Sequence, residues 1–207
     1  MRLHSHLRDL ALRVAQHEMG HYVVGTALGF RTGDVTLEII GPTNEHRGAA
    51  SIELAMQIES LSDVASYLER RVQVLYAGAA AETLKIQSPN NLVDQQTACD
   101  LLERPGLGAE QDYAKSRELV HLLRDIRHPH TNCADADAIE RELTTISEEL
   151  WVKSVALVEK HAKIICGLAS NLAGKVKKVR SEVRLQKHEI EELPAIKEFM
   201  LKLDSQS

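Results

Sequence analysis

A short motif near the start of the chain carries the clearest chemical pattern in the sequence. His17, Glu18 and His21 belong to the run His-Glu-Met-Gly-His, in which the two histidines are four residues apart. On a helix such residues share one face, so both imidazoles can reach one zinc ion at Zn–N distances of about 2.0–2.1 Å. Glu18, one residue along, can accept the proton of a zinc-activated water, whose pKa falls toward about 7. The motif therefore predicts a zinc hydrolase with Glu18 as its catalytic base.

A catalytic zinc also needs a third protein ligand and an open position. Glu82, Asp100, Asp112 and several histidines are candidates, and the sequence spacing does not choose among them. The competing interpretation of the motif is an exposed helix face that carries two unrelated histidines. The motif lies in a proline-free segment with apolar periodicity and small residues nearby, which favours the metal site.

The composition favours packed helices. The chain has 207 residues, of which 43% are hydrophobic, 27% are charged and only 3% are aromatic. A core built from Leu, Ile, Val and Ala suits helices better than a β-sandwich. A chain of this length forms one domain or at most two small ones, and we expect a single domain over residues 1–207.

The charge and the cysteines limit the partners and the compartment. The net charge of −5 argues against a nucleic-acid binder. Cys99, Cys133 and Cys166 form no CxxC pair, so we expect no disulfide framework or thiolate zinc site, and a reducing compartment fits. The N-terminus does not resemble a signal peptide, and no apolar run approaches the roughly 20 residues of a membrane-spanning helix. We therefore expect a cytoplasmic location and no membrane segment in this chain.

Apolar periodicity predicts a mainly helical fold with one small sheet. Apolar residues alternate over residues 35–39 and again over 50–54, which predicts two strands joined by a loop. The small residues Ala77–Ala81 indicate close packing at one helix end, and Lys175–Arg180 is predicted to be a solvated, charged helix face. Helices are expected over residues 7–28, 62–84 and 109–126, over 135–172 as one helix or two in series, and as short pieces between 85 and 108 and around Pro194.

Three segments, in order, resemble the FtsH-type peptidases, the protease part of membrane-bound AAA+ proteases. VAQHEMGHYVVGTAL is similar to the family's zinc-binding helix with its HEAGH motif. LERRVQVLYAGAAAETL resembles the family's arginine, aliphatic run and Ala-Glu helix, and GLGAEQDYAKSRELV resembles its Gly-Ala-x-x-Asp helix. The tail LQKHEIEEL is a weaker match, and together the segments span about residues 10–195.

The resemblance implies a zinc endopeptidase with one Zn2+ per chain, and it assigns roles to two further carboxylates. Asp112 would be the third zinc ligand, and Glu82 would be the hydrogen-bond partner that orients a ligand histidine. The competing interpretations are a carboxylate at a helix N-terminus for Asp112 and a solvated side chain for Glu82. The implied fold is mainly α, a helical FtsH-like peptidase domain with a two-to-three-stranded β element after the zinc-binding helix. Residues 49–54 would bind the substrate backbone as an added edge strand.

The sequence also departs from this family. The family carries an ATPase module, whereas this chain contains no GxxxxGK[ST] loop for nucleotide phosphates. We therefore expect either cleavage of unfolded or flexible protein substrates without ATP, or a separate AAA+ ATPase as partner. The alternatives are a binding or regulatory module that does not cleave and, with less support, a zinc hydrolase of non-peptide substrates. Self-association is a further expectation, because the related modules form six-membered rings.

A second metal site is a weaker possibility. His128 and His130 flank a proline, with Cys133 nearby. The four-ligand spacing of structural zinc is missing, so solvated loop histidines are the better interpretation.

Overall fold

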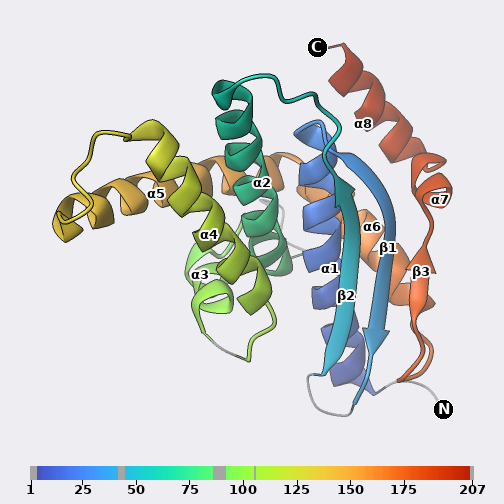
Figure 1. The fold of residues 1–207 in the computed structure, drawn as a ribbon. Coiled ribbons are helices and arrows are strands. Elements are labelled where there is room, and N and C mark those ends of the chain that lie inside the picture. The colour runs from blue at the N-terminus through green and yellow to red at the C-terminus, as the bar shows by residue number, and fades with distance from the viewer. Residues whose placement is uncertain (1–3, 42–44, 86–91, 105, 206–207) are drawn as a thin grey trace.

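The computed structural model describes residues 4–41, 45–85, 92–104 and 106–205. It is mainly helical and has a three-stranded antiparallel sheet (Figure 1). The described residues form the helices α1 (Ser5–Ala27), α2 (Leu61–Glu82), α3 (Gln95–Glu103), α4 (Glu110–Arg127), α5 (Ala136–Lys160), α6 (Ala162–Lys175), α7 (Lys187–Glu191) and α8 (Pro194–Asp204), and the strands β1 (Arg31–Ile39), β2 (His46–Glu53) and β3 (Val183–Leu185).

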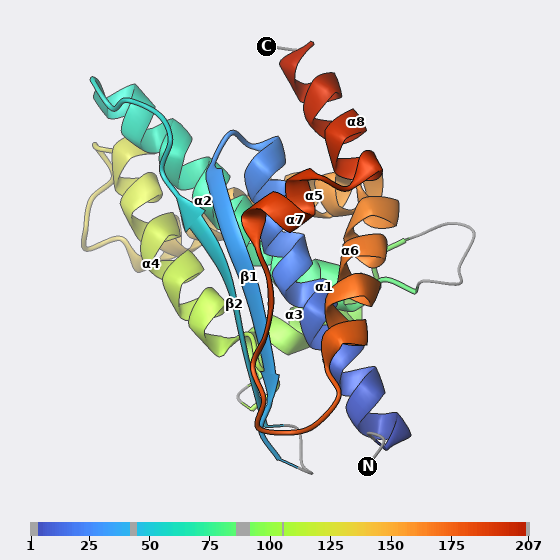
Figure 2. The same cartoon turned by 90° about the vertical axis from the view of Figure 1, so that its right-hand side faces the viewer.

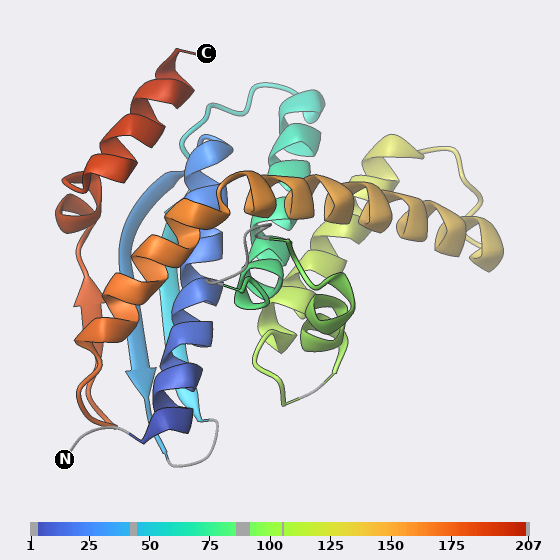
Figure 3. The ribbon, with the colours of Figure 1, turned by 180° about the vertical axis from the view of Figure 1, so that it is seen from behind.

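Helix α1 is the central element of the fold. The sheet covers one side of it, α2 runs alongside, and α6 lies across its opposite side (Figures 1 and 3). Every residue from Val14 to Gly25 is therefore buried, and this part of the helix has no solvent-facing stripe. The helix ends at Ala27, and Gly29 adopts a φ of +80° just beyond it, a left-handed conformation that favours glycine.

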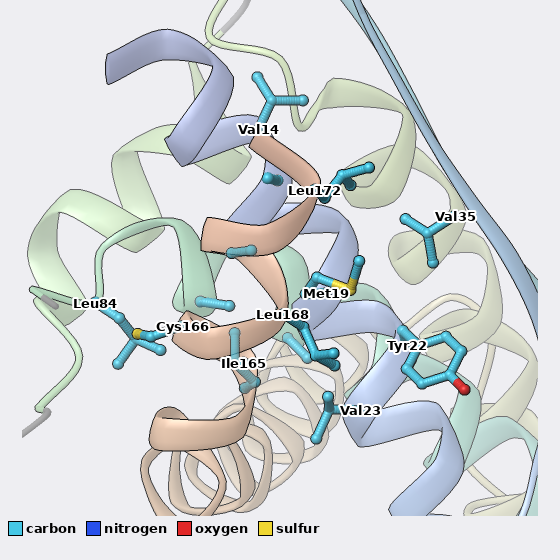
Figure 4. Close-up of a cluster of buried hydrophobic side chains, with 14 of the residues drawn as sticks. Val14, Met19, Tyr22, Val23, Val35, Leu84, Ile165, Cys166, Leu168 and Leu172 are labelled. Atoms are coloured by element: carbon cyan, nitrogen blue, oxygen red, sulfur yellow. The ribbon is translucent and has the colours of Figure 1, made fainter. Parts of the chain in front are cut away.

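Aliphatic side chains join α1 to α6. Figure 4 shows Met19 and Val23 of α1 beside Ile165 and Leu168 of α6, and all four are at most 3% exposed. This contact fixes the face of α1 that points away from its two motif histidines. Packing against α6 thus sets the rotation of α1 about its axis without the need for a bound metal ion.

The sheet has the order β2-β1-β3, with β2 at one edge (Figure 2). Val35, Leu37 and Ile39 of β1 are fully buried, so the predicted alternation is confirmed and its apolar side faces the core. Residues 42–44 of the loop between β1 and β2 lie outside the described residues. The third strand comes from the C-terminal part of the chain, because Val183–Leu185 pairs with residues 35–37 of β1.

One sequence prediction about the C-terminal part is wrong. The segment Lys175–Arg180 is not a charged helix face, because α6 ends at Lys175 and the chain continues as a loop. Val176 is buried, and the backbone amide of Arg180 donates to the carbonyl oxygen of Ile39 at 2.7 Å. The helix must end here so that β3 can pair with the edge of β1 that is not paired with β2.

The other helix predictions hold within a few residues. The segment 135–172 forms two helices in series, separated at His161. Helix α2 begins at Leu61, one residue before the predicted start at residue 62, and Ser60 is its N-cap. Its hydroxyl accepts from the amide of Asp63 at 3.2 Å, and the Asp63 carboxylate accepts from the Ser60 amide at 2.9 Å. This reciprocal capping box explains the shift, because Asp63 serves as its third helical residue.

Helix length alone does not make a membrane span here. Helices α1 and α5 have 23 and 25 residues, which is long enough in principle. Among the described residues, however, no helix combines this length with the apolar character that crossing a bilayer requires.

At Gly20, α1 and α2 are in close contact. A Cβ atom at Gly20 would lie 2.5 Å from the carbonyl oxygen of Ala77 and 2.6 Å from the Cβ of Ala81. We expect Gly20→Ala to lower the free energy of unfolding by about 1–3 kcal/mol, despite the higher helix propensity of alanine, because backbone must move apart. Urea unfolding measures this. The control is Gly167→Ala in α6, where a Cβ would meet nothing within 4 Å, so a gain of roughly 0.5–1 kcal/mol is expected. Equal effects in both variants would contradict the close contact.

Candidate metal centre

Two helices distant in sequence bring three potential metal ligands together. His17 and His21 lie one turn apart on α1 and are 7% and 8% exposed, and Asp112 lies in the first turn of α4. The Nε2 atoms of both histidines lie 3.0 Å from the same oxygen, Oδ2 of Asp112. One ligand atom from each residue falls within 4.8 Å of the others, so this group could hold a metal ion.

The remaining nitrogen of each imidazole is held by a second hydrogen bond. The Nδ1 of His21 lies 2.7 Å from the backbone carbonyl oxygen of Val74. A carbonyl only accepts, so Nδ1 carries a hydrogen, and in the neutral imidazole that binds a metal the lone pair would be on Nε2. The Nδ1 of His17 lies 3.3 Å from Oε2 of Glu82. Such outer partners fix the orientation and the tautomer of ligand histidines.

Two glycines leave the space that this arrangement needs. A Cβ atom at Gly78 of α2 would lie 2.5 Å from Cε1 of His21 and 2.6 Å from Nε2 of His17. The predicted close packing of Ala77–Ala81 is confirmed, because its alanines are fully buried, and Ala77 and Ala81 lie directly against Gly20 of the motif helix. On the opposite side, a Cβ at Gly48 of β2 would overlap the carboxylate of Glu18. Neither position tolerates a larger residue without moving the group.

Burial and mutual charge shift the acidity of these side chains. Burial alone would lower the pKa of His17, but hydrogen bonds to Asp112 and Glu82, with the charge of Glu18, raise it to about 10. Burial opposes ionisation of Asp112, yet the charge of His21 and the bonds to both histidines hold its pKa well below the usual value. Burial raises the pKa of Glu18, and the nearby histidines only partly oppose this. The metal-free centre therefore holds a proton on His17 between two carboxylates.

The group opens onto a cavity of about 800 Å³. His17, Glu18 and His21 line it from α1, and the exposed edge strand β2 lines it from residue 46 to residue 50 and again at Ile52. The start of α4 and the preceding residues 106–108 close the far side. Glu18 and a strand that pairs on one side only, among the described residues, thus line the same cavity.

The donor set suits a catalytic metal ion. Two imidazole nitrogens and one carboxylate oxygen are ligands that zinc commonly takes, and three protein ligands leave a position open for water or substrate. The same set also suits other first-row metals. The histidine orientation, the buried setting and the adjoining cavity all fit such an ion.

The other sequence candidates lie elsewhere. Asp100 is on α3 and forms an ion pair with Arg104 at 3.1 Å, so it is not part of the group. His128 lies 3.7 Å from Glu142, and the described residues contain no second metal-binding group around it. Sequence reasoning missed the Val74 carbonyl, which has no side-chain signal. It also did not predict that Gly48 and Gly78 leave space for the motif side chains, although Gly78 belongs to the run of small residues Ala77–Ala81.

Comparison with known proteins adds no family assignment. No protein-family model matches the sequence, and no curated protein matches it significantly. The resemblance to the FtsH-type peptidases rests on the three ordered motifs, and the function must be argued from the centre itself.

Metal binding should displace the proton of His17. Because its pKa is about 10 in the metal-free fold, His17 is protonated at pH 7, whereas a zinc ligand must be neutral. We expect about one proton to be released per zinc bound at pH 7, and zinc affinity to rise as the pH increases from 6.5 toward 9. The same proton stabilises the metal-free fold fully below the unfolded pKa of about 6.5, and that contribution is lost as the pH rises through about 10.

Titration calorimetry in two buffers with different ionisation enthalpies measures the released proton. The exposed His121 of α4 provides a control, since His121→Ala should release the same amount. A binding enthalpy that does not depend on the buffer would contradict the protonated state of His17.

Proposed function

We propose that the chain is a zinc-dependent endopeptidase of the FtsH type, with His17, His21 and Asp112 as zinc ligands and Glu18 as the catalytic base. The observation that carries this proposal is the convergence of both Nε2 atoms on one oxygen of Asp112 beside a cavity. Buried ionisable groups are costly in a fold unless they are paired or bind a metal. Their position beside Glu18 and an open strand edge supports catalysis over a purely structural role.

The proposal assigns each side chain a separate task. A bound zinc ion would supply a Lewis acid that polarises a peptide carbonyl and lowers the pKa of water. Glu82 and the Val74 carbonyl keep the two imidazoles oriented through their Nδ1 atoms. Glu18 accepts the proton of the attacking water and later delivers it to the leaving amine. Burial favours this task because it raises the pKa of Glu18 and makes the carboxylate a stronger base than an exposed one.

The strand edge supports a peptide as the substrate. Strand β2 pairs with β1 on one side only, so among the described residues its other edge can accept hydrogen bonds from an extended peptide. Gly48 lies against Glu18, and residues of β2 line the cavity on both sides of this point, from His46 to Ile52. A peptide could therefore extend beyond the scissile bond in both directions, which favours an endopeptidase acting on unfolded or flexible segments.

The test is cleavage of casein by zinc-loaded protein without ATP. We expect Glu18→Gln to keep one zinc per chain and to lose at least about a hundredfold in rate, because general acid–base catalysis contributes that much. Glu118→Gln is the matched control, since Glu118 is exposed on α4 away from the cavity, and it should cleave as the wild type does. Full activity of Glu18→Gln would contradict the mechanism. Zinc binding without cleavage by the wild type would instead favour a binding module that works with a separate ATPase.

A further inference from the structure

We propose that the cavity selects substrates with an acidic side chain on the Ile52 side of the scissile bond, where Arg71 and Lys115 would bind the carboxylate. This inference rests on the proposed peptidase function and adds a substrate preference to it. Three features support it, namely the position of the two cations, their lack of partners and the chemistry of carboxylate binding.

Contacts along α1 place Arg71 at one end of the cavity. His21 bonds to Val74 and, further along α1, the carbonyl of Leu28 accepts from Arg70 at 3.4 Å, so α1 and α2 run antiparallel. Arg71 therefore lies about one turn beyond the metal group, in the direction in which α1 approaches its C-terminus.

Strand β2 runs in the same direction as α1. Glu18 contacts Gly48, and a Cβ at Gly25 would meet the side chain of Ile52 at 3.4 Å. The Ile52 end of β2 is thus level with the part of α1 that lies beyond His21. Arg71 and Ile52 both line the cavity, so they mark the same end of it.

Lys115 reaches this end from the third wall. Asp112 contacts the histidines at the start of α4, while Arg127 at the end of α4 pairs with Glu69 near the start of α2. Helices α2 and α4 are therefore antiparallel. Lys115 lies three residues beyond Asp112 along α4 and also lines the cavity, so it is displaced from the metal group toward Arg71.

These two cations have no partner within the described part of the chain. Arg71 is partly buried, yet no hydrogen bond or ion pair holds its guanidinium, and the same is true of the exposed Lys115. The chain has 30 acidic and 25 basic residues, so the lack of a partner is not caused by a shortage of carboxylates. Arg13, which also lines the cavity, lies 3.9 Å from Glu82 and is already paired.

A substrate carboxylate is the natural partner for such a pair. A guanidinium binds a carboxylate through two parallel hydrogen bonds, and partial burial strengthens the interaction by reducing competition from water. Three helical residues span about 4.5 Å, while an extended peptide rises about 3.3 Å per residue. The acidic side chain would therefore belong to the first or second substrate residue on that side of the scissile bond.

The experiment compares labelled octapeptides that differ only in Glu or Gln at these positions. Binding to zinc-loaded Glu18→Gln protein is measured by fluorescence anisotropy, and cleavage by zinc-loaded wild type is measured in parallel. We expect the Glu peptide to bind roughly tenfold more tightly than the Gln peptide, and added salt to reduce this ratio. Adding Arg71→Gln should bring the ratio close to one without weakening the binding of the Gln peptide. Adding Lys115→Gln, a change at an exposed position, should lower the ratio in part.

The controls separate this preference from folding and from catalysis. Arg8→Gln removes one exposed arginine outside the cavity and should leave the ratio unchanged. Equal binding of the Glu and Gln peptides would overturn the preference, whether or not the wild type cleaves them. A ratio that persists in both Arg71→Gln and Lys115→Gln would overturn the assignment to these residues. If the Glu peptide binds more tightly than the Gln peptide and Arg71→Gln removes this difference, but the wild type cleaves neither peptide, the preference stands and the proposed hydrolysis fails.

Discussion

The contact of two histidines on α1 with one carboxylate on α4 is the interaction on which the arrangement of the rest depends. It joins residues that are 91 and 95 positions apart in the sequence, and it lies in an interior that is built mainly from aliphatic side chains. Polar groups in such a setting are stable only when their hydrogen-bonding capacity is used. Every nitrogen of the two imidazoles has a partner, and these partners come from α2 and α4. The centre therefore links the three helices α1, α2 and α4.

The surrounding elements leave this contact accessible from the cavity. Helix α6 and the sheet occupy the other sides of α1, so the motif histidines can face only α2 and α4. Gly78 and Gly48 keep side chains out of the space on either side of the motif. Among the described residues the sheet ends at β2, and residues of this strand line the same cavity. The tightly packed motif helix and the strand β2 thus lie beside the same cavity. A site that must hold a metal ion and also bind a peptide is commonly built in this way.

The sequence predicted the parts of this structure that depend on local periodicity. The helix around His17 and His21, the two strands of the first hairpin and the tight packing near Gly78 all follow from the spacing of apolar and small residues. The spacing of residues in the sequence did not identify Asp112 as the third ligand, because Asp100 and Glu82 were equally good candidates. Only the family resemblance selected it, and the fold then brought it to the histidines. The position of β3 was not predicted, although the family resemblance implied two to three strands, because three residues are too few for a periodic signal and a lysine-rich segment precedes them. Its position is set by pairing with β1, which is a long-range effect.

The central claim is that His17, His21 and Asp112 together bind one metal ion. X-ray absorption spectroscopy of the zinc-loaded protein tests it most directly. The account predicts one zinc per chain with two imidazole nitrogens and a carboxylate oxygen at about 2.0–2.2 Å, and no sulfur ligand. The spectrum and the stoichiometry should be lost in the His17→Ala/His21→Ala protein. Zinc that binds equally well to that variant, or through cysteine, would contradict the account.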